Sequence, residues 1–307
     1  MNCRLKVLDL CAGAGGLACG FEKAGFDVTG VDISENAIET FQLNNKGKCI
    51  KANLLKELIE TDSEIIIGGP SCRPWSAVNL TRRGKKHKDY KLLSGFFKHV
   101  EHNQPQIFIL ENVPAITKET ALWRNIKRLK RQGYSILSQT VTYSNYGAPT
   151  KRHRFIAFGI KGKEAGLFFK NLSKYERPPT PVKDVIWDLR DKANGEIRDH
   201  VWPNLRTIDK YKHYYETGKY GWYILEWAKP APSFGNVMKT YILHPDSFSG
   251  SPKRVISVKE ALLVMGFDKN FHFPEKLGLG ARYQMVVDSV SPIFSYAAAL
   301  ATKEFIA

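Results

Sequence analysis

The chain has 307 residues and is strongly basic, with 46 Lys and Arg against 30 Asp and Glu and a formal net charge of +16. Hydrophobic residues make up 43% and aromatic residues 12%, which excludes a wholly disordered chain and is ordinary for a globular enzyme of one or two domains. The charge favours a polyanionic partner such as nucleic acid, although a basic protein that is merely highly soluble has the same composition.

Membrane insertion and disulfide bonding are not expected. No apolar run approaches the ~18 residues of a transmembrane helix, and the N-terminus lacks the apolar core of a signal peptide. The five cysteines are odd in number and contain no CxxC pair, which argues against a disulfide framework and against a zinc cluster. We therefore expect a cytoplasmic protein without metal.

The first part of the chain alternates between strand-like and helix-like segments. The predicted strands, rich in Val, Ile and Leu, are residues 5–9, 27–32, 64–67, 106–110, 134–143 and 154–160. The predicted helices between them are residues 17–24, 35–44, 92–102 and 119–132. This alternation predicts an α/β fold with a mainly parallel sheet and helices on both faces.

The texture changes after about residue 162. Between residues 177 and 250, prolines, aromatic residues and charges mix without a sustained period, and helical patterns return at 258–265 and 292–303. We therefore expect a first domain over residues 1–165, completed by a C-terminal helix over 283–307, and a smaller irregular domain over residues 166–282.

A cysteine follows directly after one of the predicted strands. The sequence IIIGGPSCRPWS over residues 65–76 begins with a β-branched run typical of a strand buried on both faces. Gly68, Gly69 and Pro70 then end the strand, so Cys72 lies just beyond its carboxyl end, where ligands collect in open α/β sheets. A deprotonated thiol at such a place can act as a nucleophile.

Three acidic residues also lie at strand ends. Asp9 precedes the glycine-rich turn CAGAGG, whose small residues let the backbone approach a ligand, and Asp32 ends the second strand. Glu111 follows the apolar run IFIL. In a parallel sheet these carboxylates and Cys72 meet along one edge. The glycine turn alone is a weak signal, since nicotinamide enzymes, flavoproteins and methyltransferases all use one.

Basic residues complete this set. In YGAPTKRHR, which leads into the last predicted strand, alternation places Arg152 and Arg154 on the same face, where they could hold a base or a phosphate. The run RRGKKHK over residues 82–88 would suit a flap closing over DNA phosphates, or is simply a solvated charge run. We interpret the basic residues on the helix at 119–132 as a solvated face.

Six blocks in this order resemble the cytosine-5 DNA methyltransferase family of prokaryotic type. The blocks are DLCAGAGG, IIIGGPSCRPWS, ENVP, YGAPTKRHR, RVISVKEALLVMGF and YQMVVDSVSP, and they cover essentially the whole chain. The resemblance implies a Rossmann-like sheet, S-adenosylmethionine as methyl donor and a cytosine of double-stranded DNA as acceptor. It also makes the first domain the catalytic and donor-binding domain, and residues 166–282 the target-recognition domain.

The resemblance implies a role for each catalytic candidate. Cys72 would add to carbon 6 of the cytosine, and Glu111 would hydrogen-bond ring nitrogen 3 and the exocyclic amine. Arg154 and Arg152 would orient the base through its carbonyl side. Because a stacked base cannot be attacked in this way, the cytosine must be flipped out of the duplex.

The donor site follows from the same resemblance. It is implied at Asp9, Cys11, Gly13, Gly15, Asp32, Ile33, Asn53, Leu54 and Asp288. Several positions depart from the family pattern: Cys11 replaces a usual Phe, Asn53-Leu54 a usual Asp-Ile, Thr150 a common Gln, and Val287-Asp288 a usual Gly-Asn. Ser71 and Arg73-Pro74-Trp75 also vary the usual surroundings of the nucleophile.

The favoured hypothesis is a DNA cytosine-5 methyltransferase of a restriction–modification system, acting as a monomer beside a cognate restriction endonuclease. A tRNA cytosine-5 methyltransferase is the alternative, and the size of the variable region, large enough for target recognition, argues against it. A DNA-binding regulator without catalysis is suggested only by the altered last block. A nicotinamide oxidoreductase explains the glycine turn but neither Cys72 nor Glu111.

Overall fold

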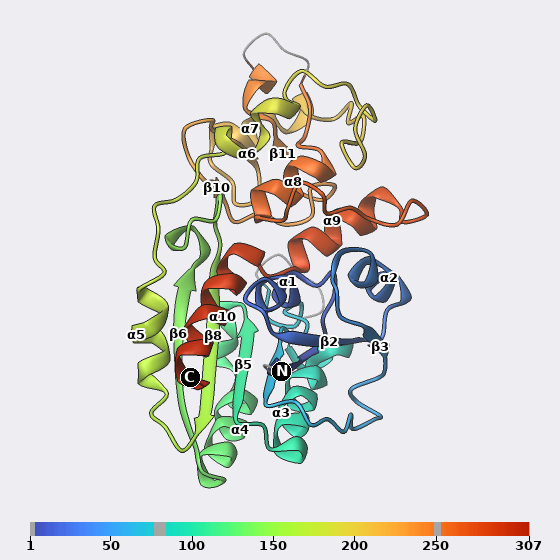
Figure 1. Ribbon diagram of the computed structural model, residues 1–307. Helices are drawn as coiled ribbons and strands as arrows, with labels where there is room; N and C mark the ends of the chain where they lie inside the picture. The colour runs from blue at the N-terminus through green and yellow to red at the C-terminus, as the bar shows by residue number, and fades with distance from the viewer. Residues whose placement is uncertain (1–3, 77–83, 249–252, 307) are drawn as a thin grey trace.

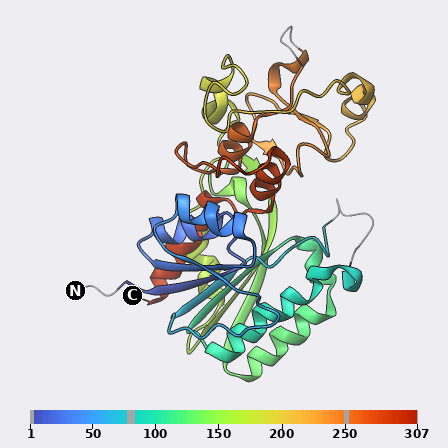
Figure 2. The same ribbon diagram turned by 90° about the vertical axis from the view of Figure 1, so that its right-hand side faces the viewer.

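A computed structural model describes residues 4–76, 84–248 and 253–306 (Figures 1 and 2). A sheet flanked by helices forms the lower part in Figure 1, and a part built from short elements lies above it. The main sheet has the strand order β3-β2-β1-β4-β5-β8-β6. Its strands are β1 (Lys6–Leu10), β2 (Asp27–Asp32), β3 (Cys49–Lys51), β4 (Ile65–Gly68), β5 (Ile107–Asn112), β6 (Tyr134–Thr142) and β8 (His153–Lys161).

The sheet is mainly parallel, as predicted. The strands β3, β2, β1, β4 and β5 pair in parallel, so their carboxyl ends share one edge. The exception is β8, which pairs antiparallel with both β5 and β6. The sequence did not reveal this reversal, because an apolar strand pattern carries no information on direction.

Alternate residues of the central strands pack into two apolar layers. On β5, Ile107 and Ile109 join the layer under α1 and α10, whereas Phe108 and Leu110 join the layer under α3 and α4. Figure 2 shows helices on both sides of the sheet. Burial on both faces is the reason that these strands read as unbroken apolar runs.

Apart from one helix that the sequence did not reveal, the helices of this part lie close to the predicted bounds. They are α1 (Gly16–Lys23), α2 (Glu35–Asn44), α3 (Leu92–Asn103), α4 (Thr120–Arg131), α5 (Gly166–Ser173) and α10 (Pro292–Ile306). The predicted strands missed β3, whose three residues are too few to show a pattern. The pattern after residue 162 also hid α5, which packs against α10 in the same apolar layer as the sheet although we assigned its residues to the second domain.

The upper part has an apolar cluster of its own. Apart from Ala14 of the glycine turn, its members lie between Val182 and Val287 and include the inner faces of α8 (Val258–Met265) and α9 (Leu279–Asp288). The remaining elements of this part are short: α6 (Lys183–Ile186), α7 (Lys212–Glu216), β9 (Tyr223–Ile224), β10 (Ala231–Pro232) and β11 (Ile242–Leu243). Several contacts join the parts, among them the pairing of β10 with β7 (Thr150–Lys151), and α9 lies between the two parts in Figure 1.

The segment of α9 and α10 is long and apolar enough to cross a membrane by length and composition, although its sequence contains no unbroken apolar run of that length. Residues Leu279–Ile306 form this segment, with 67% of its most apolar window buried inside the fold. The segment is divided into α9 and α10, with Ser289 to Ser291 between them. We therefore regard it as a pair of core helices.

Candidate active site

The Cys72 loop is held from both ends. It leaves β4 at Gly68, and the buried side-chain amide of Asn112 donates a hydrogen bond to the Pro70 carbonyl at 2.7 Å. Ser71 Oγ donates to Asp89 Oδ2 at 2.9 Å. Beyond the cysteine, Trp75 is 6% exposed, and its Nε1 donates to Glu119 at 3.1 Å. These contacts fix the thiol at the carboxyl edge of the sheet.

Glu111 lies in a buried network at the same edge. Its Oε1 accepts a hydrogen bond from the Tyr143 hydroxyl at 3.1 Å and pairs with Arg154 Nε at 2.9 Å. The Glu111 and Arg154 side chains are 10% and 9% exposed. Among residues 4–76, 84–248 and 253–306, Oε2 has no hydrogen-bond partner, and it lies beside Gly69, where an added Cβ would be 2.9 Å away. One carboxylate oxygen is thus anchored and the other faces the Cys72 loop.

The two arginines lie on one face, as the alternation predicts. Arg152 and Arg154 are buried, whereas Lys151 and His153 are exposed. Arg152 Nη2 donates to the Val287 carbonyl at the end of α9. Its Nε has no hydrogen-bond partner among the described residues. A buried donor of this kind calls for an acceptor from a ligand.

Cys72 lies in the field of four charged groups. Burial raises the pKa of its thiol, and the negative charges of Asp288 and Glu111 raise it further, whereas Arg154 and Arg152 lower it. In this state the thiol is therefore protonated near neutral pH. Cys72, Glu111, both arginines and Asp288 form one cluster.

The glycine turn forms a second cluster with Asp9 and Asp32. Gly13 and Gly15 have φ values of 57° and 83°, which favour glycine, and the Gly13 amide donates to Asp32 Oδ2 at 2.9 Å. Asp9 is 1% exposed, and neither of its carboxylate oxygens has a hydrogen-bond partner within the described ranges. Burial, and then the charge of Asp32, raises the pKa of Asp9 well above its usual range. An unpartnered buried carboxylate fits a ligand that brings a positive charge or a proton donor.

The other candidate donor-site residues differ in how exposed they are and in what they contact. Cys11 follows β1 with φ 62°, next to Asp32 and Asp9, whose charges add to burial in raising the pKa of its thiol. Ile33 is 60% exposed just after β2, open to a ligand. Asn53 Oδ1 already accepts the Leu55 amide at 3.0 Å. Leu54 is 6% exposed and packs in the apolar layer under α3, so only its backbone is available to a ligand.

Two basic segments were singled out from the sequence. Arg82 and Arg83 of the expected flap lie outside the described residues, and Lys85 and Lys86, which follow them, are exposed. Lys127, Arg128, Lys130 and Arg131 of α4 are exposed, which agrees with a solvated face.

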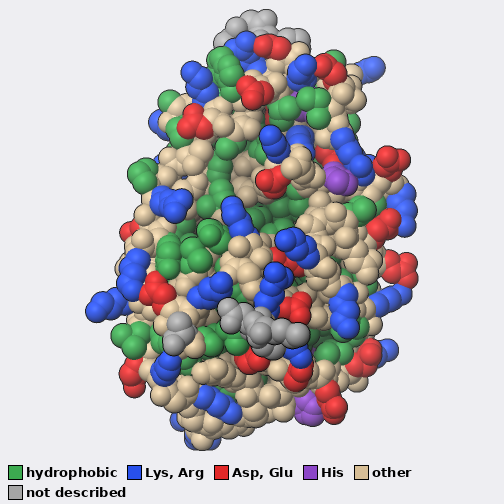
Figure 3. All heavy atoms as spheres, viewed as in Figure 1, with side chains coloured by type: hydrophobic (Ala, Val, Ile, Leu, Met, Phe, Trp, Pro, Cys, Tyr) green, Lys and Arg blue, Asp and Glu red, His purple; other side chains and the backbone are tan. Residues whose placement is uncertain are grey.

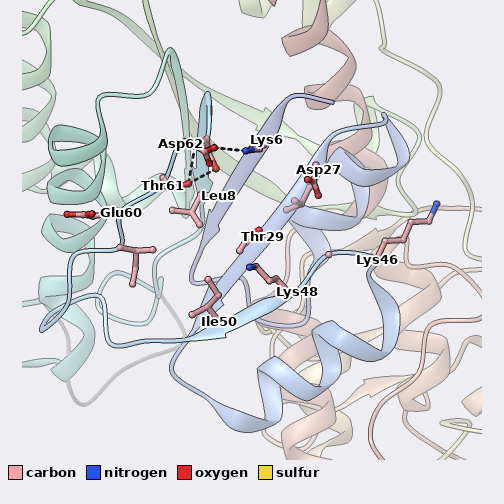
Figure 4. Close-up of a pocket in the computed structure, with 14 residues that line it drawn as sticks. Lys6, Leu8, Asp27, Thr29, Lys46, Lys48, Ile50, Glu60, Thr61 and Asp62 are labelled. Atoms are coloured by element: carbon pink, nitrogen blue, oxygen red, sulfur yellow. Dashed lines mark hydrogen bonds and ion pairs between the residues drawn. The ribbon is translucent and has the colours of Figure 1, made fainter. Parts of the chain in front are cut away.

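A surface hollow of about 860 Å³ lies at the opposite, amino ends of the strands (Figure 4). It is lined by residues at the starts of β1 and β2 and by the segments before β3 and β4, and an ion pair joins Lys6 to Asp62 across it at 2.5 Å. None of the candidate site residues lines this hollow. The hollow is therefore separate from the candidate site residues at the other edge of the sheet.

Comparison with known proteins agrees with this geometry. The family model of the C-5 cytosine-specific DNA methylases matches residues 5–303. The chain belongs to this family. The Type II methyltransferase M.FnuDI of Fusobacterium nucleatum is 29% identical over 98% of this chain and 94% of that protein, and M.NgoPII of Neisseria gonorrhoeae is 25% identical over 98% and 96%. The structure of the Entamoeba histolytica methyltransferase EhMeth matches with a TM-score of 0.74 over 99% of both chains at 16% identity, which shows the fold alone.

Sequence reasoning missed three contributors to the active site of this DNA (cytosine-5) methyltransferase. Tyr143 is fully buried, hydrogen-bonds Glu111 and stacks on Phe294, although the pattern showed it only as the end of a strand. Asn112 belongs to the ENVP block, but its hydrogen bond to the Cys72 loop has no sequence signal. The third is the pairing of Arg73 with Asp288, which lie 215 positions apart.

Proposed function

We propose that this DNA methyltransferase acts on a flipped-out cytosine in a specific duplex sequence, with Cys72 as nucleophile, Glu111, Arg152 and Arg154 around the base, and S-adenosylmethionine as methyl donor. The observation that carries the proposal is the cluster of these four side chains at the carboxyl edge of the sheet. Within the described part of the chain the buried Arg152 Nε has no hydrogen-bond partner, and the bonds that hold Glu111 involve Oε1 and not Oε2, so both atoms are suited to a base edge.

The chemistry begins at the sulfur. Carbon 5 of cytosine is a weak nucleophile until a group adds at carbon 6, and a thiolate is well suited to this addition. The thiol gives its proton to solvent, and the thiolate forms the S–C6 bond while the C5–C6 double bond opens. With a proton at ring nitrogen 3, the product is an enamine whose carbon 5 is nucleophilic. The positive field of Arg154 and Arg152 favours the thiolate over the thiol. After methyl transfer, loss of the carbon-5 proton releases Cys72.

Glu111 stabilises the intermediate from the other side of the ring. Arg154 and Tyr143 hold its Oε1, which leaves Oε2 to face the base. Oε2 can accept a hydrogen bond from the exocyclic amine, and in the protonated acid it donates its proton to ring nitrogen 3, which neutralises the charge that thiolate addition places on the ring. Arg152, whose Nη2 is anchored on the α9 carbonyl, can direct Nε to the base carbonyl.

The residues at the glycine turn fit S-adenosylmethionine, which supplies an electrophilic methyl group on a sulfonium. The unpartnered Asp9 carboxylate suits the α-ammonium of the donor. Asp32 holds the turn through Gly13 and retains lone pairs for the ribose hydroxyls. The exposed Ile33 side chain can cover the adenine.

The upper part contains most of the segment that we expect to recognise the target sequence. It supplies polar and aromatic surface to DNA. Its described residues include the cluster of Tyr211, Tyr214 and Trp222, with Lys219 Nζ 3.5 Å from the Tyr214 ring centre. Figure 3 shows Lys and Arg side chains on both parts and a hollow with apolar side chains between them. The net charge of +16 favours DNA through counterion release.

A covalent trap tests the proposal. DNA that contains 5-fluorocytosine lacks the proton that must leave carbon 5, so the protein–DNA adduct should persist in the wild-type enzyme and be absent in Cys72→Ala. Cys49→Ser, at a buried thiol of β3, serves as the control and should still form the adduct. Adduct formation or methyl transfer by C72A would refute the mechanism.

The target and the partners follow from two further measurements. Bisulfite sequencing of DNA from cells that express the chain should show methylation at one short motif, and methyl incorporation should be far higher in duplex DNA than in tRNA. The similarity to Type II methyltransferases leads us to propose a role beside a cognate restriction endonuclease. We further propose a cytoplasmic monomer, since one flipped base needs one active site and the four described cysteines are free thiols.

A further inference from the structure

Two departures from the family pattern meet in space. Arg73, the residue after the nucleophile, pairs through Nη2 with Asp288 Oδ2 at 2.8 Å. The two side chains are 45% and 39% exposed. Asp288 stands where the family usually has Asn. This chain therefore has a carboxylate at that position and, on the Cys72 loop, the cation of Arg73 that pairs with it.

The other oxygen of Asp288 leads into the upper part. Gln284, one turn earlier on α9, donates through Nε2 to Asp288 Oδ1 at 2.9 Å. Gln284 Oε1 accepts a hydrogen bond from Asn236 Nδ2 at 3.1 Å. The Asn236 amide is itself fixed, because its Oδ1 accepts the Met238 amide at 3.0 Å and the side chain is 9% exposed. Each of the three links in this chain of four residues thus joins a donor to an acceptor.

The end of α9 also contacts Arg152, whose charge acts on Cys72. The carbonyl of Val287 accepts a hydrogen bond from Arg152, next to Asp288, which pairs with Arg73. The helix itself is rooted in the upper part, where Tyr283 and Val286 pack in the apolar cluster. A shift of the upper part would therefore move the contacts on both sides of Cys72.

We propose that Asn236, Gln284, Asp288 and Arg73 form a relay that positions the Cys72 loop according to the placement of the upper part. The inference rests on Cys72 being the nucleophile. These four are positioning residues: they act through the loop and need not touch the base. If residues around Asn236 shift when the upper part engages its target, the relay gives the target a direct mechanical path to the nucleophile.

The charges of the relay give it a signature that a purely structural contact lacks. Cys72 faces Arg154 on β8, Arg152 before β8, Glu111 on β5, Asp288 on α9 and Arg73 on its own loop. Asp288→Asn removes a negative charge and should move the ascending limb of the single-turnover pH–rate profile to lower pH. Arg73→Gln removes a positive charge and should move it to higher pH. A general loss of stability would move neither limb in this opposed manner.

The first test measures these profiles at saturating DNA for R73Q, D288N and the double variant. Each single variant should lower the plateau rate about two- to fivefold, as expected for loss of a half-exposed ion pair. The double variant should lose no more than either single one, with its limb near that of the wild type. Multiplicative losses, or limbs that move in the same direction, would overturn the proposal.

The second test addresses the link to the upper part. Gln284→Ala keeps both charges and should lower the plateau without shifting the limb, and Asn236→Ala should add nothing in the Q284A background. If R73Q weakened DNA affinity but left the saturated rate and the limb unchanged, Arg73 would be a DNA contact and the relay would be refuted. If C72A is inactive and the relay variants behave as wild type, only the relay fails.

Asp62→Asn is the matched control. It breaks the Lys6–Asp62 pair at the opposite end of the strands (Figure 4), where the Lys6 side chain is 44% exposed, close to the value for Arg73. This variant should leave the plateau rate and the limb unchanged. An effect of D62N equal to that of D288N would show that any broken ion pair slows the enzyme.

Discussion

Asp9→Asn should have opposite effects on folding and on donor binding. Both carboxylate oxygens of Asp9 are buried without partners among the described residues, and burial, with Asp32, raises its pKa well above the usual range. The amide is also a buried polar group, but it does not ionise, so it avoids the loss of stability that the raised pKa of Asp9 causes above pH ~4. We therefore expect D9N to raise the free energy of unfolding by about 1–2 kcal/mol at neutral pH.

The effect of Asp9 on the free energy of unfolding should depend on pH. The folded pKa of Asp9 lies above its unfolded value of about 3.9, so the folded state holds the proton more tightly. This stabilisation is present below pH ~3.9 and is lost as the pH rises through the folded pKa. The stability advantage of D9N should therefore be absent in acid and develop above pH ~4.

Donor affinity should change in the other direction. If the carboxylate receives the ammonium of S-adenosylmethionine, D9N loses a charge-assisted hydrogen bond of about 1.5–3 kcal/mol, and the Kd should rise at least about tenfold. Urea unfolding and calorimetric titration with S-adenosylmethionine measure the two effects. Asp27→Asn, at the exposed start of β2, is the control and should change neither quantity. A D9N protein that is less stable and binds the donor normally would refute this reasoning.

Three further predictions concern other elements. Tyr143→Phe removes one of the two bonds to Glu111 Oε1 and should lower the rate of methyl transfer about tenfold, with no further loss in an E111Q background. His244 is buried, and desolvation lowers its pKa from about 6.5 to about 4 despite the nearby charge of Glu260. The free energy of unfolding should therefore be retained above pH ~6.5 and fall by up to about 3 kcal/mol as the pH drops towards ~4. Urea unfolding of H244Q at each pH should show no such fall. Gly159→Ala would place a Cβ into the ring of Phe108 and should lower the free energy of unfolding by at least about 1–3 kcal/mol.

Each of these three predictions has a control variant or an outcome that would contradict it. Tyr146 packs against the same Phe294 ring as Tyr143, and Tyr146→Phe should keep the rate of methyl transfer. An equal loss of rate in both variants would show that the effect of Tyr143→Phe does not come from its hydrogen bond to Glu111. The exposed His213→Gln should leave the pH dependence of stability unchanged. A Gly159→Ala protein as stable as the wild type would mean that β8 can move away from Phe108.

The sheet and its functional edge could be predicted because both follow from local rules. Strands buried on two faces read as apolar runs, and residues after parallel strands meet at one edge, which is how Asp9, Asp32, Cys72 and Glu111 were selected together. Alternation alone placed Arg152 and Arg154 on one face. The direction of β8, the three residues of β3 and most of the upper part could not be predicted, because short elements stabilised by tertiary contacts have no period to detect.

The pairing of Arg73 with Asp288 shows what a single sequence cannot reveal. Each residue by itself is an unexplained departure from the family pattern, and Asp288 alone adds a negative charge that raises the pKa of the nucleophile. Together they form an ion pair that offsets the added charge and ties the Cys72 loop to α9. Either substitution made alone would change the charge beside the thiol without this offset. The pair is therefore best understood as one feature of the active site, whose separate halves are expected to be less active than both the wild-type pair and a neutral Gln–Asn pair.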